Sequence, residues 1–207
     1  MQFDKVYIHR CYENELGYRK GISGGAGRFL FIAKEITNFF PHLSKLELND
    51  TILIDIIDLN NKIIACNYVY HNSKTAISDI GKTRDEYRLY IPSIIDTNRD
   101  LFKPNDIIAF TKHKIEDKIY FKLNLFQVST NNEEYKTLNK YLIDGKKGTK
   151  DINHLLIDLK YVNFLKIDID INEEKIITDE TIEIMSKNQK HLFDNLEEMA
   201  EQTKEVP

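Results

Sequence analysis

The sequence predicts a mostly β fold with short helices, of the α+β class, followed by a helical extension. Two observations lead to this prediction. Short segments rich in β-branched and aromatic residues recur through the first 130 residues, separated by glycine, proline and asparagine. Near the end of the chain, apolar residues instead recur at helical spacings along one narrow face. We therefore expect a barrel-like β domain over residues 1–130 and a mixed, mainly helical extension over residues 131–207.

Seven segments of the first 130 residues have the composition or the alternation of β-strands. They are residues 3–9, 29–33, 51–58, 62–70, 87–92, 106–111 and 118–129. Only Leu59, Asn60 and Asn61 separate the third segment from the fourth, so we expect these two to form a hairpin.

Helical patterns are short within the domain and longer after it. Residues 34–43 predict a helix that stops near Pro41, because proline interrupts helical hydrogen bonding. Residues 93–100 predict a helical turn and residues 132–142 a helix, whereas residues 152–171 have no clear pattern. A terminal acidic helix is predicted from the apolar positions Ile182, Met185, Leu192, Leu196 and Met199.

The composition is that of an ordinary globular chain, with 207 residues, 42% hydrophobic and 30% charged. No apolar run reaches the roughly 18 residues of a membrane-spanning helix. The first residues do not resemble a secretory signal, so we expect a cytoplasmic protein. Cys11 and Cys66 lack a Cys-x-x-Cys spacing or a nearby histidine cluster, and we interpret both as reduced packing residues.

Charge is distributed unevenly along the chain. The net charge is −4, but residues 170–207 contain eleven acidic and four basic residues, which leaves 25 basic against 22 acidic residues in residues 1–169. Attraction to phosphate acts within a Debye length of roughly 8 to 10 Å, so the local charge decides which partners bind. A slightly basic body is compatible with a polyanionic partner.

No motif predicts a cofactor or a resident metal ion. Residues 76–83 match a phosphate-binding loop only loosely, because Ala76 replaces the first glycine and a strand, not a helix, is predicted to follow. The six histidines are scattered without the spacing of metal ligands.

Two alternative functions remain open from the residues alone. Asp106, Glu116 and Lys118 have the residue types of a metal-dependent nuclease, in which two carboxylates hold a divalent cation beside a lysine. A simple β-turn explains residues 116–118 without a metal ion. The other alternative is a β-domain that binds protein or RNA and uses the acidic terminal helix as its working surface.

Two long polar segments contain the side-chain types that bind and read DNA. Residues 13–28 hold five of the eight glycines and too little apolar material for a core, so we expect an exposed loop. Its candidate DNA contacts are Asn14, Arg19, Lys20, Ser23 and Arg28. Residues 72–88 contribute Asn72, Ser73, Lys74, Lys82, Thr83, Arg84, Asp85, Glu86 and Arg88.

The order of residues in these segments resembles the B3-like DNA-binding domains of restriction endonucleases, and in particular the EcoRII effector domain. In the second segment the likeness rests on Asn72 and Ser73, then on residues 81–88 entering a strand. In the first it rests on residues 7–10, Asn14, Gly17, Gly24 and Gly25, followed by a strand and a helix that ends at Pro41. The resemblance covers about residues 3–128.

The resemblance implies a seven-stranded open pseudobarrel that grips duplex DNA with two arms in the major groove. It implies base and backbone contacts from Lys82, Arg84, Glu86 and Arg88 in one arm, and from Arg10, Asn14, Arg19, Lys20, Ser23 and Arg28 in the other. Tyr87 and Ala26 depart from the family pattern, so the recognised sequence is expected to differ.

The resemblance also implies a specificity module without catalytic activity of its own. Such modules occur fused to nucleases, and at the N-terminus of McrB-like motor subunits in LlaJI-type restriction systems. The expected partners are therefore double-stranded DNA and a nuclease or motor domain of the same system.

Overall fold

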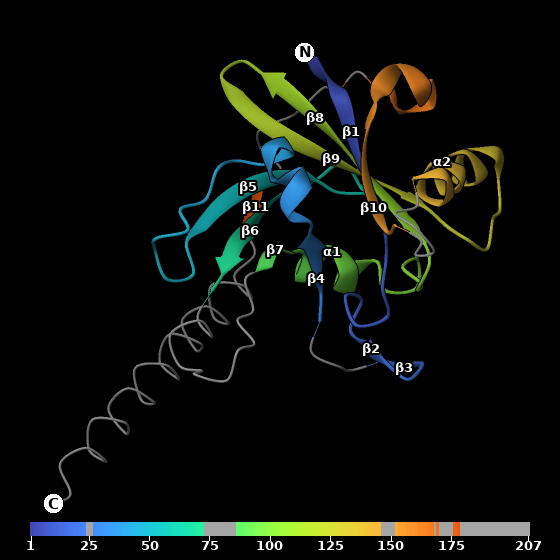
Figure 1. The fold of residues 1–207 in the computed structure, drawn as a ribbon, viewed down its shortest axis with the longest axis horizontal. Coiled ribbons are helices and arrows are strands. Elements are labelled where there is room, and N and C mark those ends of the chain that lie inside the picture. Colours follow the sequence, from blue (N-terminus) through green and yellow to red (C-terminus); the bar gives the residue numbers. More distant parts are fainter. Residues whose placement is uncertain (24–26, 73–85, 146–151, 168, 170–175, 179–207) are drawn as a thin grey trace, which may run out of the picture.

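The computed structural model describes residues 1–23, 27–72, 86–145, 152–167, 169 and 176–178. Nine strands within these residues form one strongly curled sheet that resembles half a barrel (Figure 1). Eight of them follow the order β10-β1-β8-β9-β5-β6-β7-β4, and β11 pairs with β6. The bounds are β1 Gln2–Arg10, β4 Phe29–Ile32, β5 Thr51–Ile57, β6 Ile63–His71, β7 Glu86–Tyr90, β8 Ile107–Ile115, β9 Lys118–Phe126, β10 His154–Asp158 and β11 Ile176–Thr178.

Neighbouring strands are antiparallel except for the pairs β5–β9 and β11–β6, which are parallel. The β5–β9 pair joins a sheet half made of β10, β1, β8 and β9 to a half made of β5, β6, β7 and β4. The predicted hairpin is confirmed as β5–β6, with Ile57 opposite Ile63. The segment predicted at residues 106–111 is too short, because β8 continues to Ile115.

Residues beyond 130 also contribute to this sheet. Strand β10 lies antiparallel to β1, with Val6 opposite Ile157. Helix α2 (Glu133–Asp144) begins after Asn132, whose side chain accepts a hydrogen bond from Tyr135 N, and it packs Leu138 and Leu142 into a core cluster with Val6. Two short 3-10 helices, η2 (Leu159–Tyr161) and η3 (Asn163–Leu165), follow β10.

The main core is aromatic and lies in the hollow of the sheet. Helix η1 (Lys34–Phe39) is a 3-10 helix, and the Phe40 ring that follows it lies 5.2 Å from Phe121 on β9 and 5.1 Å from Tyr68 on β6. Full burial of side chains of this size stabilises by about 1.5–3 kcal/mol each. This segment therefore plugs the open side of the half-barrel and holds its two halves together.

The remaining elements also bear on the sequence predictions. The predicted helical turn is α1 (Pro92–Thr97), and Cys11 and Cys66 are buried free thiols. Burial raises the pKa of the Cys11 thiol, so it stays protonated. No helix among the described residues is long and apolar enough to cross a membrane. The predicted terminal helix lies outside the described residues.

Candidate nucleic-acid interface

Residues 13–28 carry a short β-ribbon. Strands β2 (Tyr18–Arg19) and β3 (Ile22–Ser23) pair around a two-residue loop of Lys20 and Gly21, whose φ angles are 52° and 76°. Two positive φ values are typical of a type I′ turn, which matches the twist of a hairpin. The ribbon extends away from the main sheet, on the side toward which β6 runs (Figure 1), and it presents Lys20 to solvent.

The prediction that residues 13–28 form an exposed loop is wrong for its first part. Glu15 and Leu16 are completely buried. A Cβ atom at Gly27 would lie 2.2 Å from Asn14 O, so the two ends of the segment approach each other at a distance that only glycine allows. The segment therefore starts and ends in the protein body and projects only in between.

The Glu15 carboxylate fixes both ends of this segment. Its Oε1 accepts a hydrogen bond from Phe31 N on β4, and its Oε2 accepts one from Tyr12 N, both at 2.8 Å. The same Oε2 lies 2.8 Å from His9 Nε2 on β1. Because β4 is an edge strand, its outward N–H groups need partners. Glu15 satisfies one of them and ties β4 to the end of β1.

Tyr7 completes this buried group. Its hydroxyl lies 3.0 Å from His9 Nδ1. Burial raises the pKa of Tyr7 well above its usual value, and the nearby Glu15 raises it further. The hydroxyl is therefore protonated and can donate to His9 Nδ1, which leaves His9 Nε2 to donate to Glu15.

The second polar segment leaves the sheet between β6 and β7. At its start, Asn72 Oδ1 accepts a hydrogen bond from Asn49 N, and Asn72 Nδ2 donates to Glu47 O, both at 2.8 Å. At its end, Glu86 pairs with His71 across the two strands. The predicted contacts in between lie outside the described residues: Ser73, Lys74, Lys82, Thr83, Arg84 and Asp85.

Arg88 lies against the protein with 10% of its side chain exposed. Its Nη2 donates to Glu86 Oε2 at 2.7 Å, and its Nη1 donates to Tyr90 Oη at 3.3 Å. Its guanidinium also lies over the Phe29 ring, 4.7 Å from the centroid. These contacts fix β7 against β4 next to the second segment.

The other predicted contact residues fall into three groups. Arg10 Nη2 donates to Asn139 Oδ1 on α2 at 2.6 Å, and Arg28 Nε donates to Asp96 Oδ1 on α1 at 2.6 Å, so both have partners within the protein. Lys20 and Asn14 are exposed. Arg19 and Ser23 lie opposite Ile22 and Tyr18 in the ribbon.

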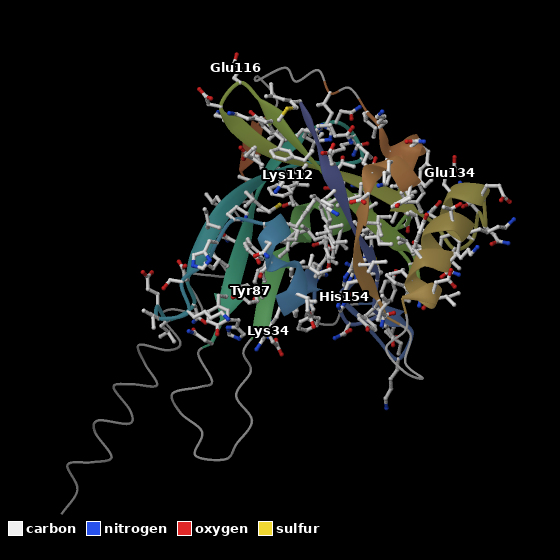
Figure 2. The ribbon with its side chains drawn as sticks, turned by 45° about the horizontal axis from the view of Figure 1, so that its top comes forward. Lys34, Tyr87, Lys112, Glu116, Glu134 and His154 are labelled. Atoms are coloured by element: carbon white, nitrogen blue, oxygen red, sulfur yellow. The ribbon has the colours of Figure 1, made fainter. Side chains whose placement is uncertain are left out.

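The residues where the two polar segments leave the protein body, which we call the arm roots, border one pocket of about 290 Å³. Figure 2 shows three of its residues, Lys34, Tyr87 and His154, on the side of the molecule opposite Glu116. The lining consists of His9, Tyr12, Phe31, Ile32, Ala33, Lys34, Glu86, Tyr87 and His154. Tyr12 comes just before the first segment and Glu86 ends the second, so the two segments flank one opening between the sheet edges.

The alternative nuclease site does not assemble. Asp106 precedes β8, whereas Glu116 and Lys118 lie beyond its other end, about 30 Å away at roughly 3.3 Å per residue. Asp106 accepts hydrogen bonds from Lys103 N and Val128 N, and burial raises its pKa. Across the part of the chain that the structure describes, no three His, Cys, Asp or Glu side chains are grouped as a metal site.

Sequence reasoning missed His9, Glu15, Tyr12 and His154. The only signal was the pairing of one acid, Glu15, with one apolar residue, Leu16, inside a glycine-rich segment.

Comparison of the chain with protein-family models and with curated proteins gives no match.

Proposed function

We propose that this chain recognises a short sequence in double-stranded DNA, with residues 13–28 and 72–88 as two arms that enter one major groove. The observation that carries the proposal is the common pocket at the roots of both segments, lined by Tyr12 on one side and by Glu86 on the other. Segments anchored at one opening can reach the same groove, which is about 12 Å wide in B-DNA.

The fold of residues 1–130 supports the same proposal. Strands β1 and β4 to β9 of the curled sheet come from these residues, and a B3-like pseudobarrel has seven strands in an open arrangement. The wall of the opening is rigid, since Glu15 ties β4 to the end of β1. A rigid support of this kind keeps two arms at a constant separation.

The predicted DNA-binding residues separate into those that contact DNA and those that position the arms. Exposed Asn14 and Lys20 act from the first arm, together with Arg19 and Ser23. In the second arm the contacts are Ser73, Lys74, Lys82, Thr83, Arg84 and Asp85. We assign Arg10, Arg28, Asn72 and Arg88 to positioning of the arms, because each has partners inside the protein. Glu86 holds Arg88 and also lines the pocket.

In this proposal the chain performs no chemistry itself. It acts as the specificity module of a restriction system and delivers a nuclease or an McrB-like motor to its site. DNA recognition of this type needs electrostatic attraction from Lys and Arg together with specific contacts to base edges. The slightly basic residues 1–169 provide the electrostatic attraction, and the polar side chains of the arms make the contacts to base edges.

Selection of duplexes from a random pool with the full chain tests this function directly. We expect one short sequence to be enriched, with at least a thousandfold preference over random duplex at physiological salt. The preference should persist when Mg²⁺ is present, and the duplexes should remain uncleaved. A pool that stays random after several rounds would contradict the proposal.

A further inference from the structure

The pocket at the arm roots has the size and lining of a binding site for one planar ring system. Its volume of about 290 Å³ lies just below the roughly 300–1,000 Å³ that hold drug-sized ligands. Its walls are mainly aromatic and apolar, with Tyr12, Phe31 and Tyr87 as the large side chains. A flat ring with a polar edge matches these aromatic walls.

The polar side chains in the lining include His9, Lys34 and His154 as well as Tyr12 and Glu86. Glu86 contributes a carboxylate, of which Arg88 occupies Oε2, and a carboxylate has acceptor positions on both oxygens. The Tyr12 hydroxyl accepts a hydrogen bond from Asn153 Nδ2, so its own proton remains to be donated. The pocket therefore presents an acceptor and a donor beside aromatic faces, as the edge of a nucleobase requires.

The backbone that carries the aromatic walls is held in place before any ligand arrives. Tyr12 and Phe31 donate their backbone N–H groups to the two oxygens of Glu15. His9, which also lines the pocket, lies between Glu15 and Tyr7. A preformed site loses little conformational entropy when it binds its ligand.

We propose that this pocket receives one nucleobase that is turned out of the duplex. The inference rests on the proposed function, which places the DNA across the arm roots. A base that stays stacked presents only its edge in the groove, whereas a pocket with aromatic side walls needs the face of the ring. Stacking on Tyr12 and Phe31 then holds the base, and Glu86 accepts a hydrogen bond from an exocyclic amino group. This favours cytosine, adenine or guanine over thymine, which has no exocyclic amino group.

A mismatch scan on the selected duplex tests the inference. Base extrusion needs less energy where the target base is already unpaired. Changing the partner of the extruded base should therefore tighten binding by the full chain about tenfold, and at one position only. Tyr12→Ala should abolish this gain and weaken binding to the matched duplex about tenfold, because one stacked base loses its platform. Tyr161→Ala, another exposed tyrosine far from the arms along the chain, should leave both values unchanged.

Phe31→Leu provides a second variant, because Tyr12→Ala removes a hydrogen bond to Asn153 as well as a ring. It should reduce the mismatch gain in the same direction. If a sequence is selected but no mismatch at any position tightens binding, the pocket inference is wrong and the DNA-binding function stands. If no sequence is selected, the proposed function itself is wrong.

Discussion

His9 Nε2 on β1 lies 2.8 Å from Glu15 Oε2, and both side chains are almost completely buried. Since Glu15 also accepts from Tyr12 N and Phe31 N, one carboxylate connects β1, the start of the first arm and edge strand β4. A buried carboxylate is tolerated only when hydrogen bonds replace its hydration. Here those bonds come from the parts of the chain that have to be held together for the arm to project.

Loss of the Glu15 carboxylate should therefore loosen the first arm and lower the stability of the fold. In Glu15→Gln the side-chain amide places donors against backbone donors, which leaves at least one buried N–H group without a partner. We expect a loss of about 2–4 kcal/mol in the free energy of unfolding, measured by urea denaturation. Amide exchange at Tyr12 and Phe31 should accelerate.

Glu133→Gln is the matched control for this change. Glu133 is exposed on α2 and makes a surface ion pair with Lys136, so its substitution should change stability by less than about 1 kcal/mol. Equal stability of Glu15→Gln and Glu133→Gln would show that the buried carboxylate does not hold the segment.

The strands could largely be predicted from the sequence, while the anchoring of the arms could not. Their largely apolar composition identifies β5 and β6, because most of their side chains are buried, and in β6 on both faces of the strand. The strand predicted at β8 ends too early, because Lys112 interrupts the apolar pattern although it belongs to the strand. Lys112 is half-buried there, with Nζ 5.1 Å from the centre of the Phe39 ring. The burial of Glu15 leaves no local pattern beyond the adjacent Leu16, because its partners are a histidine of β1 and the backbone N–H groups of Tyr12 and Phe31.

Arg88 should support the second arm without reading a base. We expect Arg88→Ala to destabilise the fold by about 2–3 kcal/mol, since the Glu86 carboxylate loses its partner and the Phe29 ring loses a cation–π contact. Affinity should fall alike for selected and random duplexes. A selected sequence that relaxes at one base pair in Arg88→Ala would instead identify Arg88 as a base contact.

Arg84 and Lys82 should have different roles in binding. A bidentate contact from Arg84 to guanine is worth roughly 1–3 kcal/mol of discrimination. We expect Arg84→Ala to lose this preference at one position, in a competition shift assay with selected and random duplexes. Lys82→Ala should weaken both duplexes equally and reduce the salt slope by about one unit.

Lys136→Ala serves as the control for both substitutions. Lys136 is an exposed cation on α2, paired with Glu133, and its loss should change neither the preference nor the salt slope. Equal losses on both duplexes from Arg84→Ala and Lys82→Ala would contradict the division into a base contact and a phosphate contact.

Tyr68 contains the one buried side-chain polar atom, among the described residues, for which the structure gives no hydrogen-bond partner. The ring lies in the aromatic core, 5.1 Å from Phe40. Removal of an unsatisfied hydroxyl relieves its desolvation penalty. Tyr68→Phe should therefore be neutral or stabilising by up to about 1 kcal/mol at pH 7. Tyr135→Phe should be destabilising by a similar amount, because it loses a hydrogen bond to Asn105 O.

The pH dependence of Tyr68→Phe provides an independent test. Burial raises the pKa of Tyr68 above its usual value of 10.0. Above pH 10 the unfolded chain therefore releases the Tyr68 proton while the folded chain keeps it, so the folded state loses stability as pH rises. The free energy of unfolding, measured by urea denaturation, should fall less between pH 7 and about pH 10.5 for Tyr68→Phe than for the natural sequence. Identical losses would mean that the hydroxyl ionises as easily in the fold as in water, which contradicts its burial without a partner.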